Sequence, residues 1–268
     1  MKNFKRILCI DIGGTFTKHC IASGRSLSTL KKESTVREKG FFPFINGVIS
    51  SYKEDSYDCV SIGFCGLVLD TNYLYSENLG VINKPVSNIR SKKQLYIAND
   101  VFCSSLTALS RKDIKSKQIV YVMIGTSIAV ALVNKGDIVT GQNNMFGEVM
   151  DIDLELGNNF LKQKGLEDFL FTTKPTTQTY KDYLSKTKQL ISVITAILAP
   201  HEIIFSGGVV IHHWNQPLRD ELIQHTNNLF KYARPKLVFA KRYNFDNIKG
   251  VSMLPSYLEH AKNNPFPA

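Results

Sequence analysis

The sequence has few cysteines, and their distribution shows no disulfide framework. Five cysteines occur among 268 residues, an odd number; none belongs to a C-x-x-C pair, and none lies after Cys103. Secreted domains that depend on disulfides carry paired cysteines at regular spacing. We therefore expect buried thiols in a reducing compartment, the cytoplasm.

The sequence also lacks a long apolar run. Its longest apolar stretch, residues 119–133, is interrupted by Gly-Thr-Ser at 125–127 and is shorter than the about 18 residues expected of a membrane-spanning helix. Asp11 and Lys18 lie where a signal peptide would stay apolar. Neither a membrane partner nor secretion is expected.

The charge is unbalanced but not concentrated. The formal net charge is +10, yet the lysines are scattered, and no expected helix carries a basic cluster with interleaved aromatic residues. We therefore expect no nucleic-acid partner, and a basic surface that attracts anionic nucleotides instead. A content of 43% hydrophobic and 21% charged residues is typical of a globular protein with one large domain or two smaller lobes.

The stretch around Gly13 and Gly14 predicts an anion-binding hairpin. An apolar run leads into Asp11, the two glycines and Thr15, and an alternating run follows with Lys18 near its start. The glycines should supply backbone angles that other residues reach only at a cost, so that N–H groups close on an anion. Thr15 and Lys18 would add a hydroxyl and a positive charge, and Asp11 could hold a hydrated cation.

Two other structures could account for this stretch. An ordinary β-hairpin would use the glycines only for the turn. A Walker loop does not fit, because the glycine-rich element joins two strands and no Gly-Lys-Thr/Ser follows.

Strands alternate with helices along the chain, which predicts an α/β fold. A second strand–turn–strand unit, with Gly125 and Thr126 at its turn, echoes the first and suggests two related halves. The basic segment 111–117 is the best boundary between them, and residues 83–85 are expected to form a loop. Helices are expected at residues 41–52, 101–110 (with Asp100 as N-cap), 166–171, 177–198, 217–230 and, after Gly250, 251–262.

With these elements in order, the chain resembles the ROK family of sugar kinases, within the actin-like and hexokinase-like ATPase superfamily, from Ile7 to about Leu258. The motifs that carry the resemblance are Asp11-Ile12-Gly13-Gly14-Thr15 with Lys18, Gly66-Leu67-Val68 with Asp70, Asn83, Asn99-Asp100, Gly125-Thr126 with Asn134-Lys135-Gly136 and Gly141, Gly147-Glu148, Pro200-His201-Glu202-Ile203-Ile204 with Gly207-Gly208-Val209, and Gly250.

The resemblance implies a two-lobed actin-like ATPase (ribonuclease H-like) fold with a nucleotide and sugar cleft between the lobes. Residues 1–112 would form the N-terminal lobe and residues 113–268 the C-terminal lobe, with the last helix packing back on the N-terminal lobe. The protein would be a homodimer. It would use ATP and Mg²⁺ to phosphorylate a hexose of the glucose type or an N-acetylhexosamine at the 6-hydroxyl.

The resemblance also assigns roles to particular residues. Asp100 would be the catalytic base, although without the other motifs it would be explained as a plain N-cap. The expected sugar-binding residues are Asn83, Asn99, Asp100, Glu148 and Glu167. The expected nucleotide-binding residues are Asp11, Gly13, Gly14, Thr15, Lys18, Gly125, Thr126, Gly207 and Gly208, with Asp11 holding Mg²⁺ through water. The simpler alternatives are a surface lysine for Lys18, solvated acids for Glu148 and Glu167, and a strand-to-helix turn for Gly207 and Gly208.

The chain departs from the family pattern at several points. The usual zinc cluster is absent, since no cysteine follows Cys103 and Asp151 replaces the histidine, so no structural zinc is expected. Ser127 and Ala129 stand where the family has glycine and would narrow the phosphate space. The helix-turn-helix of the repressor branch is missing, which disfavours a DNA-binding regulator. The open alternatives are an N-acetylmannosamine kinase, a polyphosphate-using glucokinase and a catalytically weak protein that senses a sugar or nucleotide.

Overall fold

The computed structural model describes residues 4–24, 26–70, 72–125, 128–141, 144, 146–147, 178–212, 214–229, 234–241 and 246–263. The chain divides into two compact units. Unit 1 comprises Met1–Ser110, Thr140–Met145 and Phe245–Ala268, and unit 2 comprises Arg111–Val139 and Phe146–Asn244.

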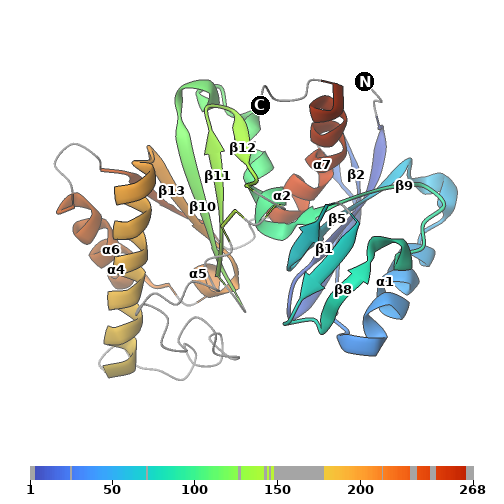
Figure 1. The fold of residues 1–268 in the computed structure, drawn as a ribbon, viewed down its shortest axis with the longest axis horizontal. Helices are drawn as coiled ribbons and strands as arrows, with labels where there is room; N and C mark the ends of the chain where they lie inside the picture. Colours follow the sequence, from blue (N-terminus) through green and yellow to red (C-terminus); the bar gives the residue numbers. More distant parts are fainter. Residues whose placement is uncertain are drawn as a thin grey trace. The chain divides into compact units, whose positions relative to one another are not determined.

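Unit 1 is built on a six-stranded mixed sheet of order β3-β2-β1-β5-β9, with β4 pairing with β2 (Figure 1). Strands β1, β5 and β9 are parallel, and β2 runs antiparallel to β1. The strands are β1 (Arg6–Ile12), β2 (Phe16–Ser23), β3 (Ser26–Leu27), β4 (Lys31–Ser34), β5 (Cys59–Phe64) and β9 (Gln94–Asn99).

The central strands of this sheet are buried on both faces. Leu8 and Ile10 of β1 share a core with helix α1 (Phe41–Ser50), whose apolar residues Phe41 and Ile45 are fully buried. Helix α7 (Asp246–Asn263) packs on β1 and β5 and against helix α2 (Asp100–Leu106). Because side chains alternate along a strand, odd-numbered residues of β1, including Asp11, face away from the α1 core.

A small antiparallel sheet, β6 (Leu67–Leu69), β7 (Tyr73–Ser76) and β8 (Val81–Pro85), follows β5. The expected loop at residues 83–85 is therefore wrong, because Lys84 and Pro85 pair with β7. Pairing overrides the local turn signal here. Strand β8 lies at the sheet edge, where a proline costs no ladder hydrogen bond.

The last helix begins earlier than the sequence predicted. Gly250 was expected to precede it, but α7 starts at Asp246 and contains Gly250. A Cβ atom at position 250 would clash with the carbonyl group of Cys103 in α2. The glycine therefore permits close helix packing and does not mark the helix start.

Unit 2 repeats the strand order of unit 1. Its five-stranded sheet has the order β12-β11-β10-β13-β14, with β10, β13 and β14 parallel and β11 antiparallel to β10. The predicted second strand–turn–strand unit is confirmed. Lys135 and Gly136, with φ of 52° and 96°, form the two-residue turn from β11 to β12. The strands are β10 (Gln118–Ile124), β11 (Ile128–Asn134), β12 (Asp137–Val139), β13 (Glu202–Ser206) and β14 (Lys236–Phe239).

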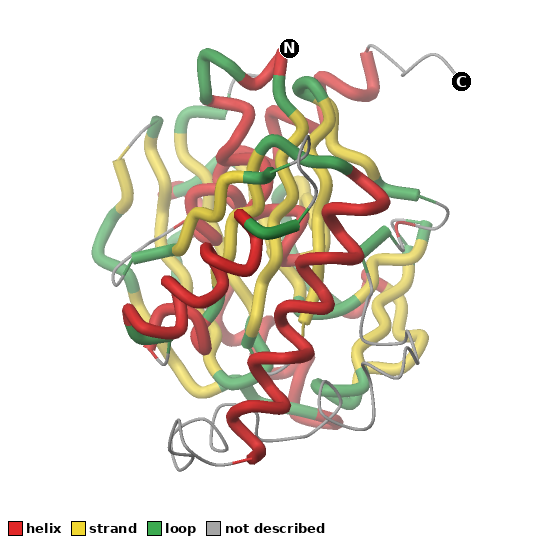
Figure 2. Tube along the Cα trace, turned by 90° about the vertical axis from the view of Figure 1, so that its left-hand side faces the viewer, coloured by secondary structure: helices red, strands yellow, loops and turns green. Residues whose placement is uncertain are grey.

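Helix α4 (Gln178–Leu198), in the foreground of Figure 2, covers this sheet together with α5 (Gly208–His212) and α6 (Gln216–Asn227). Ile191 and Ile194 of α4 share the core with β10 and β13. The rings of Phe205 and Phe239 stack, and Trp214 contacts Phe205 in a tilted arrangement and Phe239 edge-on. The expected helix at 166–171 lies outside the described residues. None of the described helices is long and apolar enough to span a membrane.

Candidate active site

The carboxyl ends of three parallel strands meet at one edge of the unit 1 sheet. Ile12, Phe64 and Asn99 are aligned across β1, β5 and β9. Asp11 and Asp100 therefore lie at the same edge, two strand spacings or about 10 Å apart along the sheet. In α/β folds, ligands bind at this edge.

Asp11 is a buried carboxylate with two polar partners. It is 3% exposed, and the Nζ of Lys18, its cross-strand neighbour, lies 3.5 Å from its Oδ2. The side chain of Asn247 in α7 donates the second hydrogen bond. Burial raises the pKa of Asp11, while Lys18 and Asn247 act in the opposite direction.

A polar chain continues from Asn247 toward helix α2. The hydroxyl of Ser104 lies 2.8 Å from the Oδ1 of Asn247 and 3.1 Å from the carbonyl oxygen of Asp100. Asn247 thus links the Asp11 carboxylate to the first turn of α2. No local pattern in the sequence signals this residue, because its partners lie at the other end of the chain.

The first hairpin turn does not use its glycines as predicted. Neither Gly13 nor Gly14 is among the described glycines with positive φ, so the expected special backbone angles are wrong. The turn is closed by a hydrogen bond from the N–H of Gly13 to the carbonyl of Phe16 (3.0 Å). A Cβ on Gly13 would lie 3.0 Å from that same oxygen, which explains the need for a small residue.

Asn99, and not Asp100, caps helix α2. The Oδ1 of Asn99 accepts hydrogen bonds from the backbone N–H groups of Val101 and Phe102 (2.9 and 3.1 Å), and its Nδ2 donates to the carbonyl of Gly66 (3.0 Å). The predicted N-cap at Asp100 is wrong, because this residue is already the first helical one. Asp100 is 9% exposed, and its Oδ1 accepts a hydrogen bond from the backbone N–H of Val101 (2.8 Å) in the first turn of α2.

The small sheet carries Asn83 on its edge strand. Asn83 is exposed and has a left-handed backbone, with φ of 48°, close to an irregularity in the pairing of β7 with β8. Asparagine tolerates this conformation better than most residues. Asp70, after β6, is also left-handed, with φ of 47°.

In unit 2, Gly125 follows β10 at the position that Gly13 has in unit 1. A Cβ on Gly125 would meet no described atom within 4 Å, so the backbone is open at this point. Thr126 and Ser127 lie outside the described residues. Ala129 lies opposite Met123 in the β10–β11 pair.

Two other glycines of unit 2 are required by contacts with neighbouring strands. Gly207, with φ of 97°, joins β13 to α5, and a Cβ there would clash with the backbone of Ile124. Gly147, with φ of 89°, would clash in the same way with Val130. Glu148, which follows it, and Glu167 lie outside the described residues, as does Asp151.

In each unit taken by itself, the residues present fit a part of a nucleotide with its magnesium ion. Asp11 supplies the carboxylate oxygen that Mg²⁺ prefers, directly or through water. The open backbone at Gly125 leaves room for phosphate oxygens. The hydroxyl of Ser206, directly before Gly207 and Gly208, is buried and has no hydrogen-bond partner among the described residues. Within the same residues, no group of three or more His, Cys, Asp or Glu side chains is arranged to hold a metal.

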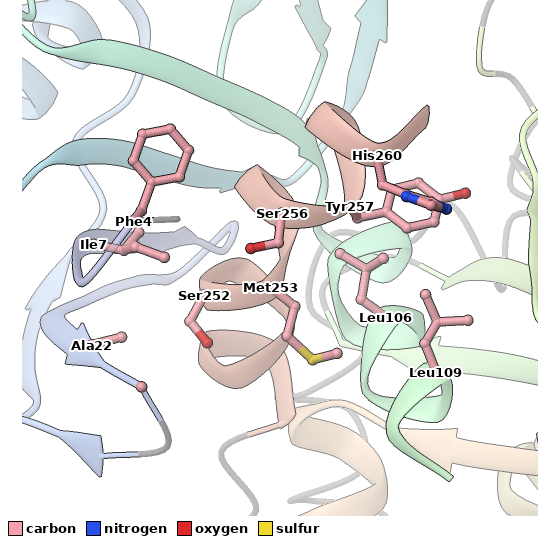
Figure 3. Close-up of a pocket in the computed structure, with 11 residues that line it drawn as sticks. Phe4, Ile7, Ala22, Leu106, Leu109, Ser252, Met253, Ser256, Tyr257 and His260 are labelled. Carbon is pink, nitrogen blue, oxygen red and sulfur yellow. The ribbon is translucent and has the colours of Figure 1, made fainter. Parts of the chain in front are cut away.

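A separate cavity of about 420 Å³ lies in unit 1 and contains none of the predicted site residues. Figure 3 shows Met253, Tyr257 and His260 of α7 facing it, with Ile7 of β1 and Leu109. Ile7 is near the amino end of β1, whereas Asp11 is near the carboxyl end. This cavity is therefore distinct from the candidate site.

The duplicated sheets, each with an antiparallel hairpin followed by two parallel strands, define an actin-like ATPase fold. The sequence model of the ROK family matches residues 7–164, and the chain belongs to the ROK family. No curated protein sequence matches it significantly.

Solved structures share the fold at low sequence identity. A ROK family glucokinase from Streptomyces griseus, in complex with glucose and AMPPNP, is 12% identical, with coverage of 94% of this chain and 99% of that one and a TM-score of 0.75. A putative N-acetylmannosamine kinase from Listeria monocytogenes is 14% identical (95% and 99% covered, TM-score 0.74). A ROK family transcriptional regulator, a homologue of the E. coli MLC protein, is 14% identical (94% and 78% covered, TM-score 0.69).

Proposed function

We propose that this protein is an ATP-dependent sugar kinase that phosphorylates a hexose or N-acetylhexosamine, at the 6-hydroxyl. The observation that carries the proposal is the placement of two acids, Asp11 and Asp100, at one sheet edge beside a hairpin of the phosphate-binding type. Membership in the ROK family and the fold shared with kinases support it.

Asp100 is the proposed general base. The sugar hydroxyl would attack the γ-phosphorus, the bond from that phosphorus to the β–γ bridging oxygen would break, and Asp100 would take the hydroxyl proton. Asn99 positions this acid by fixing the start of α2 and by bonding to Gly66. Asn83, Asn99, Glu148 and Glu167 are the proposed sugar ligands.

The two hairpins are the proposed phosphate sites. Gly13, Gly14 and Thr15 of unit 1 and Gly125 and Thr126 of unit 2 would present backbone N–H groups to the phosphate chain. Mg²⁺, when bound, would neutralise charge on the phosphate oxygens. Asp11 would orient it through water, and Lys18 would hold Asp11 ionised. Gly207 and Gly208 would let the backbone approach the adenosine.

The substrate proposal places glucose-type hexoses first and N-acetylmannosamine next, as in the two kinases that share the fold. Polyphosphate is kept as a second donor. A cytoplasmic homodimer is proposed on the family resemblance, and the free cysteines fit a reducing compartment.

A second candidate function is sensing of a sugar or nucleotide without efficient turnover. Two observations favour it: a transcriptional regulator shares the fold, and Ala129 occupies a position where the family usually has glycine.

The deciding experiment measures phosphorylation of glucose, mannose, fructose, N-acetylglucosamine and N-acetylmannosamine with ATP or polyphosphate as donor. Asp100→Asn is the matched variant, because it keeps the shape of the side chain and removes the base. Turnover of one sugar that falls about 10³-fold in the variant is expected. Binding without turnover would support the sensor, and absence of all binding would refute the proposal.

A further inference from the structure

A short segment of unit 1 donates hydrogen bonds to the turn of the β1–β2 hairpin. It consists of residues 35–37, directly after β4. The hydroxyl of Thr35 donates to the carbonyl of Gly13 (2.8 Å), and its backbone N–H donates to the carbonyl of Thr15 (2.9 Å). The Nη2 of Arg37 donates to the carbonyl of Gly14 (2.7 Å). All three carbonyl groups of the turn are therefore bound by this segment.

The direction of these carbonyl groups determines where the N–H groups point. In a trans peptide, the C=O of one residue and the N–H of the next point in opposite directions. Since the carbonyl groups of Gly13 and Gly14 face residues 35–37, the N–H groups of Gly14 and Thr15 face the other side. Successive N–H groups on one side of a turn form an anion-binding concavity, and a carbonyl oxygen on that side would repel the anion.

Arg37 also brings a positive charge to the turn. Its guanidinium bonds to a neutral carbonyl, and it forms no ion pair with any described carboxylate. Arginine stays protonated at all physiological pH values. Its charge is therefore not neutralised by an ion pair with any described residue.

The same segment continues to the small sheet. The N–H of Glu38 donates to the carbonyl of Leu79 (2.7 Å), and a Cβ on Gly80 would lie 2.7 Å from the Cγ of Glu38. This contact fixes the far end of the segment against the turn before β8. Residues 35–38 are thus anchored at both ends, which favours a fixed orientation of Arg37.

We propose that Thr35 and Arg37 are positioning residues for phosphate binding. They turn the carbonyl groups of Gly13 and Gly14 away from the ligand side, and Arg37 adds charge that favours the nucleotide phosphates. This inference rests on the proposed function of the hairpin as a nucleotide site.

Isothermal titration calorimetry with AMPPNP and Mg²⁺ on the full chain tests the inference without turnover. Arg37→Ala should weaken nucleotide binding about tenfold, Thr35→Val less, and Arg37→Lys should recover part of the loss. Arg6→Ala is the matched control, because Arg6 lies at the other end of β1 from the turn. This substitution removes the same charge, together with a surface ion pair to Asp58. It should leave nucleotide affinity unchanged.

Glucose binding and the thermal midpoint separate positioning from folding. Both should stay near the wild-type values in Arg37→Ala. Equal loss of sugar and nucleotide affinity in Arg37→Ala would overturn the inference while leaving the proposed function in place. Unchanged nucleotide affinity in both Arg37→Ala and Thr35→Val would do the same. A wild-type protein that binds sugar but no nucleotide would overturn the inference together with the proposed phosphotransfer.

Discussion

The two units share a strand order, but their hairpins, β1–β2 in unit 1 and β10–β11 in unit 2, differ in the residues next to the turn. In unit 1, the residue two places before the turn is Asp11, and its cross-strand partner is Lys18. In unit 2, the corresponding pair is Met123 and Ala129. The same backbone arrangement carries an ion pair between the buried Asp11 and the partly exposed Lys18 in one unit, and an apolar pair in the other.

This difference suits the two hairpins to different roles in the proposed function. In the proposed function, unit 1 supplies charge, since Asp11 would orient Mg²⁺ through water and Arg37 adds a cation beside the turn. At the described positions of its hairpin, unit 2 offers backbone groups, with open space at Gly125. The repeated sheet sets where a ligand can bind, and the side chains at its edge decide which unit provides the chemistry.

The largest expected effect comes from changing the residue at the same position in each hairpin. Asp11→Ala should lower kcat about 10³-fold at saturating substrates, because the carboxylate proposed to orient Mg²⁺ is lost. Met123→Leu, the matched change in unit 2, should leave kcat within about twofold, since the side chain stays apolar and similar in volume. Steady-state kinetics over a range of Mg²⁺ concentrations measures both. An Asp11→Ala enzyme with normal kcat and Mg²⁺ dependence would remove the distinction between the hairpins.

A second prediction concerns how the helices cover unit 1. Gly250→Ala should destabilise the protein by about 3 kcal/mol, because the added Cβ meets the carbonyl group of Cys103. Gly47→Ala in α1 is the matched control. No described atom lies within 4 Å of its added Cβ, so it should stabilise the helix by about 0.5–1 kcal/mol.

Urea unfolding followed by far-UV circular dichroism measures both glycine variants. Trp214 is the only tryptophan and lies in the unit 2 core, so its fluorescence follows unit 2. Equal midpoints for Gly250→Ala and the wild type in circular dichroism would show that the α2–α7 contact is not as close as described.

The elements that the sequence predicted well are those with strong local patterns. Both hairpins, helix α1 and helix α4 have clear apolar periodicity, and each was found within a few residues of its expected bounds. The placement of Asp11 and Asp100 at one sheet edge follows from the strand order, which only the structure provides.

The parts that the sequence did not predict depend on contacts between distant segments. Gly250 signals a helix boundary locally, but its role is set by Cys103. Lys84 and Pro85 resemble a loop until they pair with β7. The choice between Asn99 and Asp100 as helix cap depends on backbone angles that composition does not determine. Arg37 and Asn247 reach the site only through the fold.

A third prediction concerns how the stability of each unit depends on pH, because a buried carboxylate in each has a shifted pKa. In unit 2, the Glu202 side chain is 5% exposed and bonds to Arg111 (2.7 and 2.8 Å) and Lys117 (2.6 Å). The hydrogen bonds from Arg111, which has the largest effect, and from Lys117 lower the pKa of Glu202 to about 2, while burial of the carboxylate acts in the opposite direction. In unit 1, burial instead raises the pKa of Asp11.

The two shifts act on stability with opposite signs. A lowered carboxylate pKa stabilises the fold above the unfolded value of 4.5, and this stability is lost as pH falls from there through about 2. A raised pKa, as at Asp11, favours the fold at acid pH and loses that contribution as pH rises through the shifted value. Glu202→Gln should therefore reduce stability by about 2 kcal/mol at pH 7 and flatten its decline below pH 4.5. Urea midpoints from Trp214 fluorescence between pH 2.5 and 7 test this, and an undiminished acid slope in the variant would contradict it.

The smallest expected effect concerns Asn247, which donates a hydrogen bond to Asp11 and accepts one from Ser104. Asn247→Ala should raise the Mg²⁺ concentration at half-maximal rate about fivefold, because Asp11 loses one of its hydrogen bonds. Asn247→Ser is the conservative comparison, since a hydroxyl can donate but does not reach as far. Ser104→Ala breaks the same chain one step further on and should act in the same direction with a smaller magnitude.

The readouts for Asn247 are the Mg²⁺ concentration at half-maximal rate and the calorimetric affinity for Mg²⁺ with AMPPNP. A structural role alone would lower the thermal midpoint and leave both unchanged. A selective change in the two Mg²⁺ measurements, with sugar KM constant, is what the hydrogen bond to Asp11 requires. Helix α7 contributes no residue to the family motifs other than Gly250. Such a result would show that it nevertheless helps to orient Asp11, which pairs with Lys18 in unit 1 and has no charged counterpart at the matching position of unit 2.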